Sequence, residues 1–536
     1  MGIAEDVERR ATELTSHERK VELEDDFVRD CLNANERGDG TLYASINRGM
    51  YLYNVSQADG EWLRWNQHVW EVDEFRDAQG AVELCALEYQ YRADELEAQI
   101  EKEGLEKKRG ESTPWKITLA AKYRSRVDRL RTDNGAKKVL VWAPIVDRSM
   151  ACRDNELNRH PTILPCANGV IDLPTGALIN GNPADMMTMA IDVPYCPEVG
   201  QKRAQDFVLE ICGSEEMAEF IQRSFGYAIS GYSHEQHIWV FIGQGRNGKG
   251  VLFSCIADVM GPFFHVINSG MLMEQKVDPP PSAASEHKHS LRCKRIIVGS
   301  ETKQGKRIDA EQVKMMTGDD AINCRPNFGK EVVFRPTHTL FLQTNHMPTG
   351  LAGDFALVQR LLKIDFPWAY VDDPAEEGRK NPSKKDIFRK KNPRLKEELL
   401  SGTGRQQFLN WLVEGYRKYI AQGIDPPQQV REGVDELSRE ENYMDEFLAD
   451  CLVDTDIPGS RVRSKTISYA LRWWISNNRA TDAKRAKSIK EINRYLRETR
   501  GYQVEKAGGV YYVLGVTFNL EVANEIAEFI NHNKLD

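Results

Sequence analysis

An α/β fold is predicted for the centre of this 536-residue chain, with a helical or α+β region before it and a winged helix after it. The first observation is that short apolar segments alternate with helical segments in residues 231–375, a pattern typical of a parallel sheet. The second is a glycine-rich segment, GQGRNGKG, directly after the first apolar segment. The third is that two helical segments followed by two short strands end the chain, within residues 457–536.

Composition excludes several classes of protein. Hydrophobic residues make up 41% and charged residues 29% of the chain, which is typical of a globular protein with real cores. No apolar run approaches the roughly 18 residues of a membrane span, and the charged N-terminus does not resemble a signal peptide. The ten cysteines are isolated and form no CxxC pair, so neither a zinc ribbon nor a disulfide framework is expected. We therefore expect a cytoplasmic protein with no membrane partner.

Charge is distributed unevenly along the chain. The net charge is −9, yet residues 461–510 hold 13 lysines and arginines against four acidic residues. A basic segment on an acidic body is expected where one module contacts a phosphate backbone. A second basic run, residues 379–396, contains proline, asparagine and serine and predicts an exposed, mobile loop. Whether that run is merely solvated or contacts phosphates stays open.

Elements before the central region are predicted as follows. A charged helix should end in a turn at residues 38–40, and residues 42–75 should form short strands, because apolar and polar residues alternate there. Residues 81–131 are helical with a break at 103–114, residues 162–180 form a hairpin, and residues 201–230 are helical. The boundaries of the N-terminal regions are predicted at 1–130 (α+β) and 131–230 (helical).

The central region should contain three buried strands, at residues 237–242, 295–301 and 337–345. A helix should run from the glycine-rich segment to about Met260, and a second should lie near residues 309–317. A hairpin is predicted at residues 321–334. A helical extension with the basic loop should follow over 376–456, then helices at 464–476 and 487–499 and the final pair of strands.

The glycine-rich segment fits the spacing G-x-x-x-x-G-K between a strand and a helix. Glycines let the backbone fold around phosphates, while successive N–H groups and the helix N-terminus face the anion. The lysine adds a point charge for the outer phosphates. An ordinary glycine-rich turn is the weaker alternative. The predicted phosphate-binding residues are Gly243, Gln244, Gly245, Arg246, Asn247, Gly248, Lys249, Gly250 and Val251.

One position departs from this pattern. Gly250 stands where a serine or threonine normally holds Mg²⁺, so no hydroxyl is available there. Water and a carboxylate, or a nearby hydroxyl such as that of Ser254, would have to hold the metal instead.

Three polar residues near strand ends and loops are candidates for hydrolysis. Glu301 ends the second predicted strand and is the candidate that orients water or holds metal; the alternative is a solvated cap at the strand end. Asn345 ends the third strand and fits a polar sensor or a turn residue. Arg360 follows a further loop, and its guanidinium can stabilise transition-state charge in a neighbouring subunit or be a plain surface residue.

Together these pieces resemble superfamily 3 helicases of the phage, plasmid and poxvirus primase-helicase type. The matching segments are ANGVIDLPTGAL, FIGQGRNGKG, SETKQGKRIDAEQVKMMTGDDAINCR, FLQTNHMP, DFALVQR and NWLVEGYRKYIAQG, in the family's order. The resemblance implies an AAA+ core over residues 231–375 and a ring, most often a hexamer, with ATP and Mg²⁺ between subunits. It also implies translocation on single-stranded DNA, generally 3′ to 5′, and separation of forked duplexes.

Residue roles follow from the same resemblance. Lys249 matches the Walker A lysine, Glu301 the Walker B acid, Asn345 the sensor and Arg360 the arginine finger that acts in trans. The DNA-gripping hairpin of the family corresponds to residues 322–334, with Arg325, Phe328 and Lys330 as candidate DNA contacts or, alternatively, as parts of a structural hairpin. In the C-terminal module Lys490, Arg494 and Arg497 share a helix face suited to a DNA backbone or to protein docking.

Priming by this chain is not expected, because no Asp-x-Asp pair lies on a predicted strand before residue 160. The N-terminal region is expected to be a collar or docking platform, and a separate primase or polymerase is a candidate partner. If the chain is viral, the host cytoplasm is its expected location. Two other functions stay open: an ATPase that loads or packages DNA without unwinding, and a DNA-binding oligomer stabilised by nucleotide.

Overall fold

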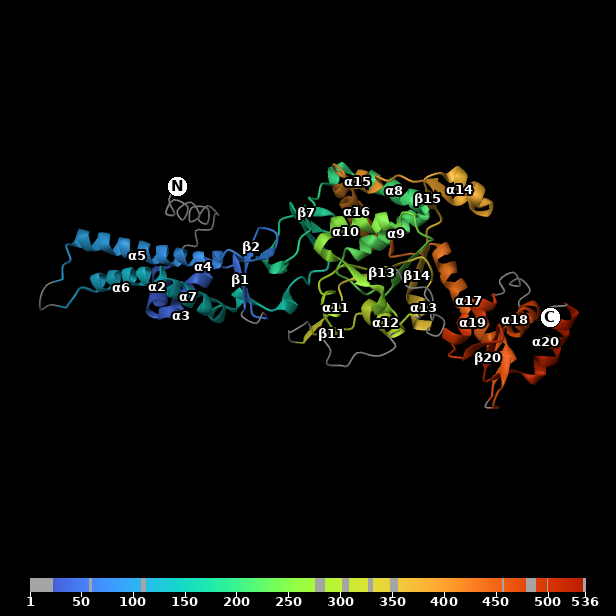
Figure 1. The fold of residues 1–536 in the computed structure, drawn as a ribbon. Coiled ribbons are helices and arrows are strands. Elements are labelled where there is room, and N and C mark those ends of the chain that lie inside the picture. Colours follow the sequence, from blue (N-terminus) through green and yellow to red (C-terminus); the bar gives the residue numbers. More distant parts are fainter. Residues whose placement is uncertain are drawn as a thin grey trace. The chain divides into compact units, whose positions relative to one another are not determined.

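The computed structural model describes residues 23–56, 60–107, 112–274, 285–300, 308–325, 331–347, 355–455, 457–478, 488–498 and 500–533 (Figure 1). The chain divides into two compact units. Residues 1–160 and 180–190 belong to the first unit, and residues 161–179 and 191–536 belong to the second. Among the described residues, no helix is both long and apolar enough to cross a membrane.

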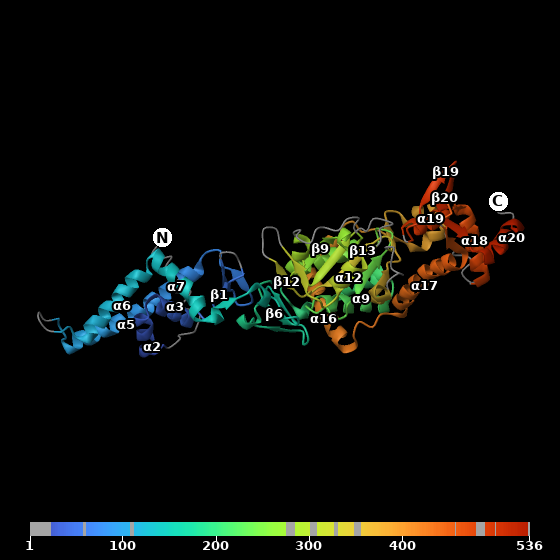
Figure 2. The same cartoon turned by 90° about the horizontal axis from the view of Figure 1, so that it is seen from below.

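The first unit combines helices with a small four-stranded sheet. The sheet has the order β3-β2-β1-β4, in which β4 runs parallel to β1. Helices α5 and α6 lie side by side, as Figures 1 and 2 show. The strands predicted in residues 42–75 are confirmed from Tyr51 onward, but residues 42–46 are helical. The interrupted helices predicted in 81–131 are confirmed. The elements are α2 (Asp25–Asn33), α3 (Asn35–Ile46), β1 (Tyr51–Asn54), β2 (Glu61–Trp65), β3 (Trp70–Val72), α4 (Asp77–Gly80), α5 (Val82–Glu103), α6 (Trp115–Leu130), α7 (Asp133–Val146) and β4 (Ala151–Cys152).

The turn predicted at residues 38–40 is wrong, because these residues lie inside α3 and are buried. A Cβ at Gly38 would stand 1.8 Å from the Cys31 carbonyl oxygen, and one at Gly40 would stand 2.6 Å from Cβ of Trp142. The glycines therefore serve close helix packing here, not a turn.

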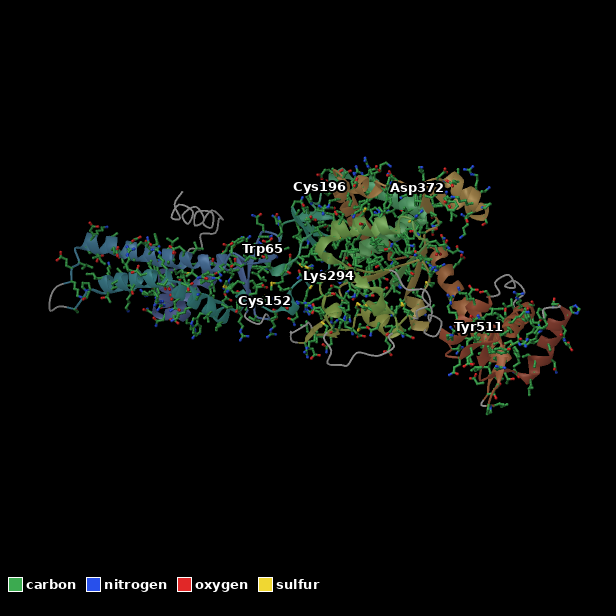
Figure 3. All side chains as sticks on the ribbon, in the orientation of Figure 1. Trp65, Cys152, Cys196, Lys294, Asp372 and Tyr511 are labelled. Atoms are coloured by element: carbon green, nitrogen blue, oxygen red, sulfur yellow. The ribbon has the colours of Figure 1, made fainter. Side chains whose placement is uncertain are left out.

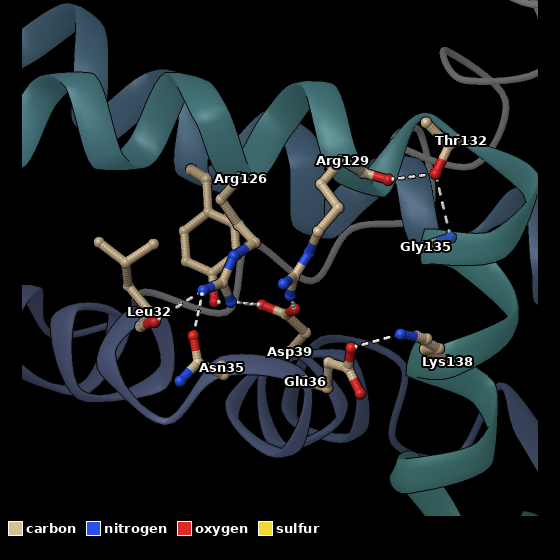
Figure 4. A network of polar contacts seen from close by, with 10 residues as sticks. Leu32, Asn35, Glu36, Asp39, Arg126, Arg129, Thr132, Gly135 and Lys138 are labelled. Atoms are coloured by element: carbon tan, nitrogen blue, oxygen red, sulfur yellow. Dashed lines mark hydrogen bonds and ion pairs between the residues drawn. The ribbon is translucent and has the colours of Figure 1, made fainter.

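The residue between these glycines, Asp39, organises a buried polar network (Figure 4). Its carboxylate accepts from Arg126 at 2.6 Å and from Arg129 at 2.8 Å, and the Tyr89 hydroxyl lies 3.1 Å away. Asp39 is 1% exposed and Arg126 is 8% exposed. This network ties α3 to α5 and α6, so helix packing overrides the local turn signal.

Replacing Asp39 with alanine is expected to destabilise the first unit by about 3–5 kcal/mol, because a buried arginine loses its counter-charge. Urea unfolding, followed by hydrogen exchange in α3 and α6, measures this loss. The matched control is Asp133→Ala, which removes exposed contacts with Lys137 and Gln79 and should lower the free energy of unfolding by no more than about 1 kcal/mol. Equal stability of the Asp39 variant and the wild type would contradict the structural role of the network.

The second unit is built on a five-stranded parallel sheet with the order β14-β8-β13-β10-β9. Parallel strands need crossovers, and helices supply several of them, so the α/β prediction is confirmed. The three predicted strands correspond to β8, β10 and β13. The sheet and its helices are β8 (Ile238–Ile242), α10 (Lys249–Met260), β9 (Phe264–Asn268), α11 (Glu286–His289), β10 (Ile296–Ser300), α12 (Ala310–Thr317), β13 (Thr339–Thr344), α13 (Phe355–Arg360) and β14 (Leu361–Asp365).

Other parts of this unit surround the sheet. The predicted hairpin at 162–180 has three strands, since β5 (Ile163–Cys166), β6 (Gly169–Asp172) and β7 (Ala177–Ile179) pair in sequence. The hairpin at 321–334 is confirmed as β11 (Ile322–Cys324) and β12 (Val332–Phe334). The helices here are α8 (Lys202–Cys212), α9 (Glu215–Ala228), α15 (Leu395–Leu400), α16 (Gly404–Gln422) and α17 (Gln428–Cys451).

The basic run at 379–396 is exposed but is not the loop predicted. It contains the end of α14 (Pro374–Lys380) and then β16 (Phe388–Lys390), which pairs with β15 (Ala369–Val371). The guanidinium of Arg389 lies 3.8 Å from the ring centroid of Trp368. Asp372, labelled in Figure 3, accepts a hydrogen bond from Lys390 through its carbonyl. Stacking and strand pairing therefore order a segment whose composition alone favours a loop.

In the described residues after α17, three helices and five short strands form the C-terminal part of the second unit. Its core includes Phe447, Trp474, Ile492 and Val513. The two predicted helices and the final pair of strands are present, and Gly508 and Gly509 turn the chain between those strands with positive φ. The elements are β17 (Leu452–Asp454), β18 (Arg461–Arg463), α18 (Ser464–Asn478), α19 (Ile489–Glu498), β19 (Val504–Ala507), β20 (Val510–Leu514), β21 (Val516–Phe518) and α20 (Leu520–His532).

Candidate nucleotide-binding site

The glycine-rich loop joins the interior strand β8 to the N-terminus of α10. Strand β8 pairs with β13 on one side and with β14 on the other, so the loop emerges at the carboxyl edge of a parallel sheet. That edge is where ligands bind in open α/β sheets. The loop also precedes a helix whose first N–H groups have no partner within the helix. Its position therefore suits an anion.

The loop backbone bends through the left-handed region. Gly245, Arg246 and Gly248 have φ of 62°, 52° and 86°. A Cβ at Gly248 would also lie 2.4 Å from Cγ2 of Ile211, on α8. Glycine at 248 is thus required both by conformation and by close packing.

Lys249 begins α10 and is 2% exposed. Its Nζ donates to the carbonyl oxygen of Gly243 at 2.8 Å and to that of Thr344 at 3.2 Å. The ammonium group thus lies between the start of the loop and the end of β13. Burial lowers its pKa from 10.5 to about 8, and Asp365 acts against this shift. The lysine can bind a neighbouring anion, which would favour its charged form.

Asn247 supplies a second buried polar group in the loop. It is 3% exposed, and its Nδ2 has no hydrogen-bond partner among the described residues. A Cβ at Gly243 would stand 2.0 Å from this nitrogen, so only glycine leaves room for the amide. An unpaired buried donor is costly unless a ligand completes it. The loop therefore offers a buried donor that an anionic ligand, such as a phosphate group, can pair with.

Residues of the segment that follows β14 contact the glycine-rich loop. The N–H of Tyr370, in β15, donates to the carbonyl oxygen of Arg246 at 2.6 Å. Lys384 Nζ lies 3.5 Å from Oε1 of Gln244. The ring of Phe366 lies 6.0 Å from Nζ of Lys249. These contacts were not predicted, because neither β14 nor β15 was recognised in the sequence.

Space does not explain the glycine at position 250. A Cβ there would meet only Nε2 of Gln343, at 3.7 Å, which is ordinary contact. The position thus lacks a hydroxyl, although its described surroundings would admit a serine. Among the described residues, no cluster of three or more His, Cys, Asp or Glu side chains suited to a metal is present.

Of the two other candidates predicted at the strand ends, the structure describes only Asn345. Glu301 lies outside the described residues, but Ser300, which precedes it, ends β10 and pairs with Gln343 of β13. Asn345 follows β13 directly and is exposed. The Thr344 carbonyl accepts a hydrogen bond from Lys249. Asn345 is the next residue in the chain and therefore lies close to the lysine.

Arg360 lies at the opposite edge of the sheet. It ends α13 immediately before Leu361, which pairs with Ile238 at the amino end of β8. Its guanidinium donates to Thr317 Oγ1 and to Gln236 Oε1, both at 2.8 Å. The structure therefore does not bring Arg360 to the loop of its own subunit.

The candidate DNA contacts lie in two places. Arg325 is exposed at the end of β11, where its backbone pairs with Ser285; Phe328 and Lys330 lie outside the described residues. On α19, Lys490 and Arg497 are exposed and Arg494 is partly exposed. The opposite face of that helix buries Ile492 and Leu496, so the predicted basic face is indeed turned away from the core.

Residues 45–222 match the family model described as D5 N terminal like. The matched segment includes parts of both structural units. Residues 241–357, which include the glycine-rich loop, match a family of unknown function (DUF5906).

Relatives of the protein come from viruses. It is 23% identical over 456 residues to "Putative helicase L207/L206" of Acanthamoeba polyphaga mimivirus, covering 83% of this chain and 46% of that protein. It is 26% identical over 208 residues to "Putative helicase V13" of Sputnik virophage, covering 38% and 25%. It is 23% identical over 291 residues to "Uncoating factor OPG117" of Vaccinia virus, covering 51% and 36%. The chain thus spans less than half the length of these relatives.

A solved structure, the apo structure of the NrS-1 C terminal region (305–718), aligns with 63% of this chain and 81% of its own chain. Sequence identity is 13% and the TM-score is 0.33, so nothing about the present fold rests on it. The resemblance to the primase-helicase family, predicted from the motifs, is confirmed by the D5 N terminal like domain and the relatives named as helicases.

Proposed function

We propose that this protein is an ATP-driven DNA helicase that works as a ring of subunits, most simply a hexamer. One observation carries the proposal: a glycine-rich loop at the carboxyl edge of a parallel sheet presents a buried lysine and an unpaired buried amide, Lys249 and Asn247, in a chain whose viral relatives are named helicases. The strand order supports an AAA+ core, because β13 lies between β8, which precedes the loop, and β10, which ends one residue before Glu301 in the sequence.

Different groups of the site have different roles in ATP binding and hydrolysis. Backbone N–H groups of residues 245–250 and the N-terminus of α10 bind the phosphates, and Lys249 neutralises their charge. Bound ATP would supply the phosphoryl group, and Mg²⁺, when bound, would neutralise phosphate charge. Glu301 would orient the attacking water and help to hold the metal, since Gly250 has no hydroxyl. Asn345 fixes that water from the end of β13.

Arg360 serves the site of the adjoining subunit. It lies at the amino edge of the sheet, whereas its own loop lies at the carboxyl edge. A ring in which one subunit's amino edge faces the next subunit's loop would complete each pocket with this guanidinium.

DNA contacts are assigned to the hairpin and the C-terminal module. Arg325, Phe328 and Lys330 would grip single-stranded DNA through its phosphates and bases as the ring steps, 3′ to 5′ by family resemblance. The winged-helix reading of residues 457–536 is supported by β18, α18 and α19 followed by the β19–β20 hairpin. The face bearing Lys490, Arg494 and Arg497 would lie on duplex backbone at a fork. A separate primase or polymerase would supply synthesis.

The affinity for ATP is expected to fall as pH rises from about 8 toward 10.5. The free protein loses the Lys249 proton near pH 8, whereas bound phosphate favours the charged form, so binding takes up a proton in this window. The decline approaches tenfold per pH unit. Below pH 8, burial of the charged Lys249 side chain lowers the free energy of unfolding. This free energy is recovered as pH rises from about 8 toward 10.5, because the unfolded chain then binds more protons than the folded protein. Fluorescent-nucleotide titration between pH 7 and 9.5 measures the affinity.

The control for this titration is Lys249→Arg, whose guanidinium keeps its charge throughout the range and should give a flatter profile. A wild-type affinity that does not change with pH would contradict the placement of Lys249 at the phosphates.

A forked-duplex assay tests the function itself. The proposal requires strand separation that depends on ATP and is lost in Glu301→Gln. ATP turnover stimulated by single strands without unwinding would favour a loading or packaging ATPase, a role to which the relative named as an uncoating factor lends some weight. Nucleotide binding without phosphate release would favour a nucleotide-stabilised DNA-binding oligomer.

A further inference from the structure

Arg360 is held at the base of the β11–β12 hairpin. Its guanidinium donates to the hydroxyl of Thr317, the last residue of α12, at 2.8 Å, and more weakly to the Lys314 carbonyl at 3.4 Å. Thr317 is 3% exposed and in turn donates to the Val313 carbonyl at 2.8 Å. One hydroxyl thus joins Arg360 to the final turn of α12. Only four residues separate Thr317 from Ile322, where the hairpin begins.

Both ends of the hairpin are fastened at this place. The Ser233 hydroxyl contacts the Asp319 carboxylate, before β11, and lies 3.3 Å from the Pro336 carbonyl oxygen, after β12. His338, at the start of β13, lies 3.1 Å from the Met316 carbonyl oxygen. Residues on either side of the hairpin are therefore tied to α12 and to Ser233.

The segment that carries Ser233 also holds Arg360. Gln236 accepts from the guanidinium at 2.8 Å. Between them, Glu235 accepts from the Tyr419 hydroxyl of α16 at 2.7 Å, and its N–H donates to the Tyr227 hydroxyl of α9 at 3.1 Å. Residues 233–236 are thus held in place by two helices. They contact Arg360 and the residues that flank the hairpin.

We propose that Thr317 and Gln236 are positioning residues for Arg360, and that through Thr317 and Ser233 the position of Arg360 is coupled to the hairpin. This inference rests on the proposed function. A guanidinium that turns toward an anion on the next subunit must leave Thr317 and Gln236. The last turn of α12 then loses a contact beside the hairpin, which is how nucleotide in one subunit would change the DNA grip of its neighbour.

The test uses the full chain and steady-state ATP hydrolysis with and without single-stranded DNA. Thr317→Val should lower kcat about tenfold with KM unchanged, because the arginine is misplaced while the loop is intact. Thr317→Ser, which keeps the hydroxyl, should restore kcat. Ser233→Ala should retain basal turnover but lose most of its stimulation by DNA. Thr337→Val is the matched control, since that hydroxyl donates to the Lys294 carbonyl and not to Arg360.

Gln236→Glu separates misplacement of Arg360 from loss of folding, because this variant is expected to stay folded. It places a carboxylate opposite Arg360, which should raise the melting temperature while lowering kcat. Wild-type kcat in both Thr317→Val and Gln236→Glu, or wild-type DNA stimulation in Ser233→Ala, would overturn the inference. If Arg360→Ala still abolishes hydrolysis in that case, the proposed function stands; normal hydrolysis in Arg360→Ala would instead refute the proposed function.

Discussion

Replacing Lys249 with alanine is expected to reduce ATP hydrolysis by at least about a hundredfold. Nζ lies between the carbonyl oxygens of Gly243 and Thr344, at the loop and the end of β13, and no other lysine among the described residues contacts both. The substitution removes the positive charge beside the loop and the two hydrogen bonds that Nζ donates to these carbonyls. Phosphate release under saturating ATP measures the effect.

Two variants control this experiment. Lys249→Met keeps most of the side-chain volume and should be equally inactive, which separates loss of charge from a cavity in the core. Lys202→Ala removes an exposed lysine of α8 paired with Asp206 and should be fully active. Normal turnover in Lys249→Met would refute the site assignment.

Replacing Arg360 with alanine is expected to leave ATP binding unchanged and to lower hydrolysis by about 10³-fold. Its position at the amino edge of the sheet separates it from its own loop, so binding in the same subunit should not depend on it. Nucleotide titration gives the affinity and phosphate release gives the rate. Arg417→Ala, an exposed arginine of α16 paired with Glu414, is the matched control.

Mixed rings show whether Arg360 acts in trans. Subunits with Lys249→Ala cannot use their own loop but still carry Arg360, whereas Arg360→Ala subunits have an intact loop. Mixing two inactive variants should therefore restore part of the activity, in proportion to the pockets that receive both residues. Absence of any recovery, with mixed assembly verified, would count against action in trans.

The buried strands and the glycine-rich loop could be predicted because their sequence signals are local. Each of β8, β10 and β13 is a short, almost wholly apolar run, and the G-x-x-x-x-G-K spacing directly follows the first. Strand β9 was missed, since it is a half-exposed edge strand whose sequence, FHVIN, has no clear apolar run. Strand β14 was missed because it follows Arg360 without a turn signal.

Tertiary contacts explain the remaining differences. The local sequence around Gly38 and Gly40 favours a turn, but in the structure these glycines allow close helix packing around the Asp39 network. The composition around residues 388–390 favours a basic loop, but in the structure Arg389 stacks on Trp368 and the segment pairs with β15. Likewise, no local pattern in the sequence marks Thr317 or Gln236 as partners of Arg360, because each lies in a different segment.

Particle mass and ATP turnover, measured on the same samples over a series of protein concentrations, test the central claim most directly. The account predicts that single subunits bind nucleotide through the loop but hydrolyse it slowly, and that turnover per subunit rises as rings form. A protein that remains a single subunit and binds no nucleotide at any concentration would contradict it.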